Sequence, residues 1–388
     1  MNKRILLIIM LCSLLLSGCW DSNEAGRMFY LFGIGVDYKD GEYKVYAQLI
    51  DFASIARSVQ PPNPDIVQSV VGEANGKTVN EAFNNLYNSL DEELYWGHIT
   101  YLVFSNDLLE QGKLNPVINA FIQFHDTRYQ TWVFSTKESI RKIMLAKPVL
   151  NKAISLSKLA YPINSYKQHS FIEPLNLRKL IINMDEPSHQ TNIPLVSLIS
   201  NWETYKSDDT ETLINGVSVV TPKNVLGELK NEQAQGLQWL SDETIRAGLS
   251  VDIADGQEDD EKNRISVVIE KMKAKVIPII SSSQVRFDIH LDMVALLSGY
   301  RGDISVAEIQ KAVKKRVEQQ IQTTYQESVK FDSDVYRLSE YLYRKHLKTW
   351  KKFERNGRIE LTNDSLRNIT AEVRVTSGRK SFKNTIEN

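Results

Sequence analysis

The stretch SVAEIQKAVKKRVEQQIQTTYQ, residues 305–326, decides the fold of the C-terminal third of the chain. Its apolar residues recur every three or four positions, at Val306, Ile309, Val313, Val317, Ile321 and Tyr325. This spacing places them on one face of an α-helix of about six turns. Ser305 and Glu308 have the spacing of a capping box, which satisfies backbone N–H groups at the start of a helix. The stretch therefore predicts a long helix that packs one face on a sheet.

The sequence on either side of this helix supplies that sheet. Residues 264–280 and 284–300 are long apolar-rich runs separated by three serines, which predicts two strands. Residues 369–375 alternate between apolar and polar side chains and predict a closing strand. Residues 334–353 have helical spacing, so we expect a second long helix there. Strands, two long helices and a final strand favour a sheet with its helices on one face.

The first half of the chain mixes strands and helices. Two apolar-rich runs, residues 28–38 and 42–51, flank Asp40-Gly41, which is a strong hairpin signal. The continuous apolar run ITYLVFS, residues 99–105, is typical of a strand covered on both faces. We expect a mixed α/β, or α+β, fold with several domains, in which mixed sheets carry helices packed on one face.

The length of 388 residues predicts two or three domains. The texture changes to short apolar runs between turn-rich pieces near residue 191 and changes back near 262. We therefore expect a signal segment over residues 1–18, an N-terminal α/β domain over 19–190, a smaller β-rich bridging domain over 191–262, and a C-terminal α+β domain over 263–388.

The first twenty residues have the pattern of a targeting segment. Lys3 and Arg4 precede an apolar run over residues 5–16, which is shorter than the ~20 residues of a spanning helix but suits a secretory signal. The sequence Leu16-Ser17-Gly18-Cys19 then resembles the lipobox of bacterial lipoproteins. In that family the cysteine carries an S-diacylglycerol group and, after cleavage, an N-acyl group. An ordinary cleaved signal peptide, or Cys19 as a small buried residue, is the alternative.

Composition excludes several classes of protein. Hydrophobic residues make up 42% of the chain, which is ordinary globular usage, so neither a polytopic membrane protein nor a disordered chain is expected. The formal net charge of −1 argues against a nucleic-acid partner. The only cysteines are Cys12 and Cys19, so no disulfide framework is available to the rest of the chain.

Motifs that carry chemistry are missing from the sequence. The histidines never stand four residues apart, and no cysteine follows Cys19, so no zinc spacing occurs. Gly33-Ile34-Gly35 lacks the third glycine of a dinucleotide loop, and Gly216-Val217-Ser218 lacks the closing glycine of a nucleophile elbow. The acidic stretch at residues 255–261 is better interpreted as a solvated loop than as a calcium site. We expect no enzyme, no metal and no cofactor.

Seven basic residues form the strongest local cluster of charge. They are Arg344, Lys345, Lys348, Lys351, Lys352, Arg355 and Arg358. Lys348, Lys351 and Lys352 are our candidates for contact with anionic lipid head groups or with an acidic partner. A solvated helix face is an equally good interpretation.

Short motifs along almost the whole chain resemble one known family. They are Cys19-Trp20-Asp21 with Glu24, Phe32-Gly33-Ile34-Gly35-Val36-Asp37, Trp96-Gly97-His98, Asn215-Gly216-Val217-Ser218-Val219-Val220, Leu226-Gly227-Glu228-Leu229, Gly236-Leu237-Gln238-Trp239-Leu240, and the set Asp332, Tyr343, Trp350 and Phe353. This order resembles the C subunits of GerA-type nutrient germinant receptors of spore-forming Gram-positive bacteria. His125 departs from the family, in which arginine is usual.

The resemblance implies a non-enzymatic lipoprotein subunit on the outer face of the spore inner membrane. It also implies two integral-membrane partner subunits, one transporter-like and one channel-like. The alternative is an extracytoplasmic solute-binding lipoprotein. That class has two Rossmann-like lobes around a cleft, which residues 264–375 fit poorly. An exported hydrolase would need a nucleophile or metal signature, and the sequence has none.

Overall fold

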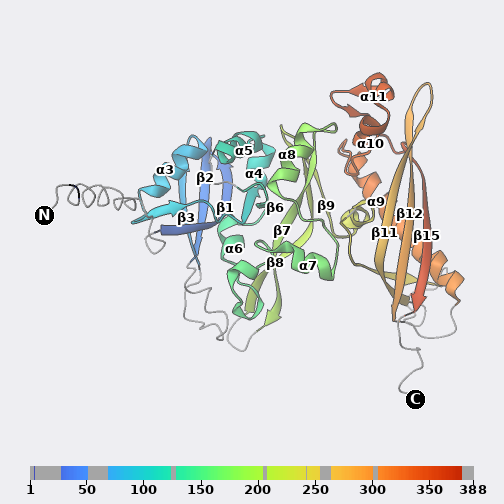
Figure 1. Cartoon of the computed structure of the whole chain (residues 1–388), viewed down its shortest axis with the longest axis horizontal. Coiled ribbons are helices and arrows are strands. Elements are labelled where there is room, and N and C mark those ends of the chain that lie inside the picture. Colours follow the sequence, from blue (N-terminus) through green and yellow to red (C-terminus); the bar gives the residue numbers. More distant parts are fainter. Residues whose placement is uncertain are drawn as a thin grey trace, which may run out of the picture.

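The computed structural model describes residue 4 and residues 28–50, 69–123, 128–203, 208–241, 243–253, 264–299 and 305–377. The signal segment, Cys19 and the acidic stretch at 255–261 lie outside the described residues. Within the described ranges the fold is mixed α+β, as expected, with a nine-stranded sheet, a four-stranded sheet and a small two-stranded sheet (Figure 1).

The first sheet contains strands β1 to β9 in the order β3-β2-β1-β5-β6-β7-β8-β9, with β4 paired to β1. Their bounds are β1 (Met28–Lys39), β2 (Glu42–Ile50), β3 (Ser69–Gly76), β4 (Glu93–Tyr95), β5 (Tyr101–Ser105), β6 (Trp132–Thr136), β7 (Thr191–Glu203), β8 (Asp208–Val220) and β9 (Val225–Lys230). The central strands β1, β5, β6 and β7 are parallel, and the outer strands are antiparallel. The predicted hairpin is confirmed, because Asp40 and Gly41 have φ values of 54° and 85°, as a two-residue primed turn requires.

Helices cover both faces of this first sheet. One face carries α3 (Val79–Tyr87), α4 (Asn106–Glu110), α5 (Leu114–Gln123) and α8 (Leu177–Asp185). The other face carries α6 (Ile140–Leu145) and the short 3₁₀ turns η2 (Val149–Asn151) and η3 (Ile154–Leu156), which precede α7 (Pro162–Gln168). All five residues of β5 are buried, as its continuous apolar run predicts. The expectation of helices on one face therefore does not describe this sheet.

The second sheet has the order β10-β11-β12-β15. Its strands are β10 (Ala247–Asp252), β11 (Arg264–Ile280), β12 (Val285–Gly299) and β15 (Leu366–Ser377), and the small sheet consists of β13 (Glu354–Arg355) and β14 (Arg358–Ile359). The long helix α9 (Val306–Val329) begins with the predicted capping box of Ser305 and Glu308. Its apolar stripe is buried in one core with this sheet, except that Val306, in the first turn, is 56% exposed.

The 3₁₀ segment η4 (Asn231–Leu240) packs on α9. Trp239 is fully buried, and its indole N–H donates to Gln320 Oε1 at 2.7 Å. The backbone N–H of Gly236 donates to Thr324 Oγ1 at 2.9 Å. A Cβ at residue 236 would lie 2.3 Å from the Tyr336 hydroxyl, so only glycine allows this close approach. The Gly236–Leu240 motif is thus a docking segment for α9.

The second helix expected over residues 334–353 is present as two shorter ones, α10 (Leu338–Lys345) and α11 (Leu347–Phe353). His346 between them leaves the helical conformation, with φ −138° and ψ 56°. This break lets Trp350 fold back so that its ring meets the ring of Tyr343 edge to face, with the ring centres 5.7 Å apart. Helical spacing in the sequence does not reveal such a break.

The segment 191–262 contributes to both large sheets. Strands β7, β8 and β9 extend the first sheet, and β10 lies at the edge of the second. The segment therefore joins the two halves through strand pairing, and the domain limits at 190 and 262 remain predictions. No helix in the described ranges is long and apolar enough to cross a bilayer.

Candidate functional site at the junction of the two sheets

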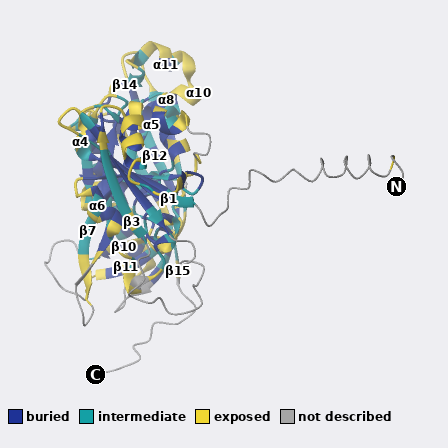
Figure 2. Ribbon diagram, turned by 90° about the vertical axis from the view of Figure 1, so that its left-hand side faces the viewer, coloured by how far each residue is buried: buried dark blue, intermediate teal, exposed yellow. Residues whose placement is uncertain are grey.

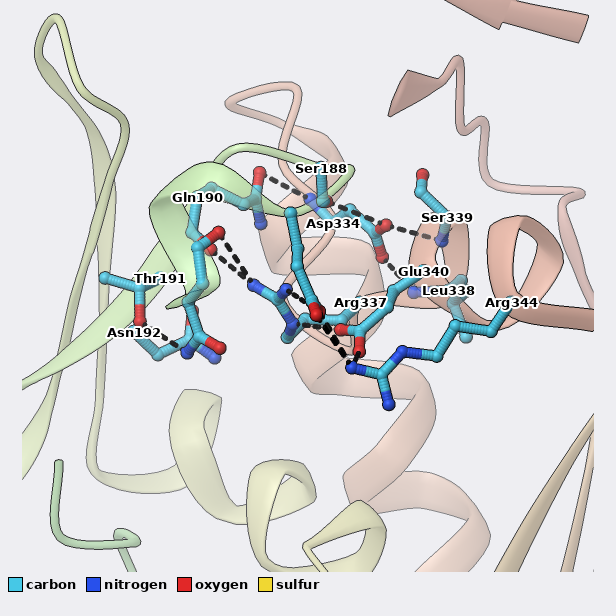
Figure 3. Close-up of polar contacts among 12 residues, drawn as sticks. Ser188, Gln190, Thr191, Asn192, Asp334, Arg337, Leu338, Ser339, Glu340 and Arg344 are labelled. Carbon is cyan, nitrogen blue, oxygen red and sulfur yellow. Dashed lines mark hydrogen bonds and ion pairs between the residues drawn. The ribbon is translucent and has the colours of Figure 1, made fainter. Parts of the chain in front are cut away.

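The loop between α8 and β7 meets the start of α10, and a buried carboxylate joins them (Figure 3). Asp334 is 2% exposed. It accepts hydrogen bonds from Ser188 Oγ at 3.1 Å, from the backbone N–H of Leu338 at 2.7 Å and from that of Ser339 at 2.8 Å. Two of these donors are otherwise unpaired N–H groups at a helix start, so Asp334 caps α10 while it fixes the loop.

The first residues of β7 reach the same segment. Gln190 Oε1 accepts from the backbone N–H of Asp334 at 3.2 Å, and the Gln190 backbone carbonyl accepts from Arg337 Nη1 at 2.7 Å. Asn192 Nδ2 donates to the carbonyl of Val335 at 2.9 Å. These bonds connect residues about 145 positions apart, so the junction is a tertiary contact between the two halves of the chain.

A chain of ion pairs lies at the rim of the junction. Arg337 Nε lies 2.6 Å from Glu340 Oε2, and Arg344 Nη2 lies 2.6 Å from Glu340 Oε1 and 2.8 Å from Glu186 Oε2. Burial alone would raise the pKa of Glu186, but the hydrogen bonds and charge of Arg344 outweigh it and lower that pKa below its ordinary value. Glu186 is thus held as a carboxylate.

A cavity of about 470 Å³ opens beside this network. Both halves of the chain line it: Ile172, Glu173, Pro174, Leu175, Lys179, Asn183, Gln190, Thr191, Asn192 and Val217 from the first, and Leu237, Leu240, Ser241, Glu243, Val335, Tyr336, Arg337, Glu340, Tyr341, Arg344 and Lys345 from the second. The wall is apolar in one part and carries convergent polar groups in another, which is the usual composition of a small-molecule site.

The residues singled out from the sequence do not lie in this junction. Cys19 is outside the described residues. Lys348, Lys351 and Lys352 are exposed on α11, at one end of the molecule (Figure 2). Lys352 Nζ donates to the carbonyl of Ser282 at 2.9 Å, whereas Lys348 and Lys351 have no partner among the described residues.

Part of the expected basic cluster is already neutralised. Arg344 pairs with Glu186 and Glu340, and Arg358 pairs with Asp332. The three candidate lysines are therefore separate from the arginines that stabilise the fold.

Three possible metal ligands meet on the outer face of the second sheet. His290 and Asp292 of β12 and Glu372 of β15 place ligand atoms within 4.8 Å of one another. The sequence search missed them because parallel pairing brings β15 beside β12 from far along the chain. Asp292 and Glu372 are exposed, and Lys273 stands directly opposite Asp292, where its positive charge disfavours a cation. We assign no ion to this group.

With the fold and junction described, comparison with known proteins defines the class. Residues 21–198 match the family described as spore germination protein N-terminal domain, and residues 215–378 match spore germination B3/GerAC like, C-terminal. The chain therefore belongs to the GerAC family of spore germination proteins, and the resemblance to the C subunits of germinant receptors is confirmed.

Particular relatives cover almost the same length. Spore germination protein KC of Bacillus subtilis (strain 168) is 20% identical over 375 residues, which are 91% of this chain and 90% of that protein. Spore germination protein YndF of the same organism is 21% identical over 311 residues, covering 74% of this chain and 73% of the relative. The crystal structure of the GerBC protein matches with a TM-score of 0.55 at 14% identity, covering 89% of this chain and 96% of that one. That match shows a shared fold.

Proposed function

We propose that this chain is a non-catalytic subunit that assembles a spore germinant receptor. In this role it is held at the outer face of the spore inner membrane by lipid on Cys19. It contacts two integral-membrane subunits, one transporter-like and one channel-like. The observation that carries the proposal is the tandem family match over residues 21–198 and 215–378, which begins two residues after the lipobox cysteine.

The chemistry of the junction supports a non-catalytic role. Asp334 is engaged by three donors, and Glu186 and Glu340 are engaged by arginines. A general base needs a carboxylate within reach of a substrate proton, and these carboxylates are committed to holding the two halves of the chain together.

The proposed anchor has a geometric consequence. Nine residues separate Cys19 from Met28, the first residue of β1. A fully extended chain covers at most ~3.3–3.6 Å per residue, so this tether reaches no more than about 30 Å. An acylated Cys19 would therefore keep the first sheet close to the bilayer. Two acyl chains meet the requirement for stable anchoring.

Labelled palmitate tests the anchor directly. We expect the full chain to incorporate radiolabelled palmitate and to sediment with membranes, and Cys19→Ala to do neither. Cys12→Ala is the matched control, because it removes the other cysteine of the chain from within the signal segment. Palmitate labelling of Cys19→Ala, or loss of labelling in Cys12→Ala alone, would contradict the proposal.

Assembly is tested separately by affinity purification of the tagged chain from detergent-solubilised spore membranes. Recovery of the two integral-membrane subunits in constant proportion supports the receptor role. A chain recovered alone from every mild detergent would instead favour the solute-binding alternative. The mixed first sheet and the hairpin-based second sheet, however, are not the two Rossmann-like lobes of that class.

A further inference from the structure

The cavity beside the junction has an unmet hydrogen-bond donor in its wall. Gln190 lines the cavity and is 1% exposed. Its Oε1 accepts from the backbone N–H of Asp334, which fixes the orientation of the side-chain amide. Its Nε2 finds no acceptor among the described residues. A buried amide donor without an acceptor is rare in folded proteins and costs stability.

A second donor of the same kind belongs to the neighbouring side chain. Arg337 uses Nε for Glu340 and Nη1 for backbone carbonyls. Its buried Nη2 makes no hydrogen bond within the described residues, because Glu186 Oε2 is 3.8 Å away. Since Arg337 Nη1 donates to the Gln190 carbonyl, the two unmet donors lie on adjacent residues of the cavity wall (Figure 3).

The rest of the lining limits what fits there. Ile172, Leu175, Val217 and Leu240 supply an apolar surface. Lys179 pairs with Glu173, and Arg344 with Glu340, so most charges of the lining are balanced. The volume of about 470 Å³ is in the range of small-molecule sites. The lining therefore suits a small body with one acceptor group and does not suit a polyanion.

We propose that this cavity binds a small organic monocarboxylate with an apolar body. The carboxylate oxygens accept from Gln190 Nε2 and Arg337 Nη2, and the cationic donor favours an ionised acceptor through a charge-assisted hydrogen bond. The apolar body lies against the Ile172 and Leu240 side of the wall. Both halves of the chain contribute to the site, so its ligand contacts the two sides of the junction at once. This inference rests on the cavity alone and is independent of the lipid anchor and of the partner subunits.

Equilibrium dialysis of the full chain in dodecyl maltoside tests the site, with detergent alone as the blank. The probe is radiolabelled isovalerate, and acetate and phenylacetate are the competing carboxylates. We expect saturable binding of about one isovalerate per chain with a dissociation constant below ~10 mM. Isoamyl alcohol has the same carbon skeleton without the carboxylate, and it should not compete at equal concentration.

Two variants locate the binding. Gln190→Glu keeps the acceptor for Asp334 N–H and replaces the donor by a negative charge, so it should weaken isovalerate binding about tenfold or more. Gln319→Glu makes the same change on the exposed face of α9 and should leave binding unchanged. Leu237→Trp narrows the apolar part of the cavity and should also weaken binding, which covers the case in which Gln190→Glu fails to fold.

Two results would overturn the inference. One is the absence of saturable binding for all three carboxylates below ~10 mM, in which case water fills the cavity. The other is isovalerate binding that is equal in the full chain and in folded Gln190→Glu and Leu237→Trp, because the ligand would then bind elsewhere.

Discussion

Arg344 Nη2 lies 2.8 Å from Glu186 Oε2, so one guanidinium of α10 holds the residue that ends α8. The same nitrogen lies 2.6 Å from Glu340 Oε1 within its own helix. Glu186 lies in the part of the chain that matches the N-terminal family, and Arg344 in the part that matches the C-terminal family. The orientation of the two halves therefore depends on a charged contact as well as on the buried bonds of Asp334.

This contact predicts a pH dependence of stability. The pKa of Glu186 is lower in the folded chain than its ordinary value of 4.5, because the effect of Arg344 outweighs burial. The contribution of Glu186 is therefore complete above pH 4.5 and is lost as the pH falls through the lower folded pKa. Because Arg344 is 58% exposed, we expect less than about 1 kcal/mol. Urea unfolding across this pH window should show a shallower acid loss for Glu186→Gln.

Glu232→Gln is the control, because it neutralises an exposed carboxylate of η4 outside the junction. It should keep the acid dependence of the unchanged chain. An identical pH profile for Glu186→Gln and the unchanged chain would show that the Arg344 contact adds nothing to stability.

The apolar stripe of α9 gives a second prediction. Val317 is fully buried in the core of the second sheet, whereas Val306 on the same helix is 56% exposed. Val317→Asp would place an unpaired charge in that core and should lower the free energy of unfolding by more than about 3 kcal/mol. Val306→Asp should change it by less than about 0.5 kcal/mol. Circular dichroism and urea unfolding of both variants make the comparison, and equal losses would place the core elsewhere.

Features that depend on neighbouring residues could be predicted from the sequence. The stripe of α9 follows from a spacing of three and four, and the first hairpin follows from Asp40-Gly41, whose backbone conformation is local. Both are confirmed. The break at His346 was missed, because the residues on either side of it have helical spacing. What bends the chain there is the later contact between Tyr343 and Trp350.

The junction could not be predicted for a related reason. Gln190 and Asp334 are 144 positions apart, and each is an ordinary polar residue in its local sequence. Only the approach of the two sheets makes them partners and removes them from water. The available signal was weak: Asp334 stands shortly before an apolar-periodic segment, as a capping residue would. That signal predicts a cap and says nothing about a cavity beside it.

The buried carboxylate provides a third prediction. Asp334→Asn keeps the shape of the side chain but points an amide donor at groups that are themselves donors. We expect a loss of about 2 kcal/mol or more in the free energy of unfolding. Faster hydrogen exchange of the Leu338 and Ser339 amides should accompany it, because both lose their acceptor. Asp364→Asn, an exposed change before β15, should have neither effect. Unchanged exchange at residues 338 and 339 would contradict the capping role.

The last prediction concerns the exposed lysines of α11. Reversing the charge of Lys348, Lys351 and Lys352 to Glu should leave the circular dichroism and the urea midpoint unchanged, because only the exposed bond from Lys352 to the Ser282 carbonyl is lost. If these lysines contact acidic partner or lipid groups, recovery of the receptor complex and germination should fall. The matched control is Lys271, Lys273 and Lys275 to Glu, since these three lysines are exposed on β11 of the same half. Reduced assembly in the α11 variant alone would locate a contact surface on that helix. If the α11 variant folds, assembles and germinates as the unchanged chain does, its lysines form a solvated face, and the partner contacts lie on another surface of the subunit.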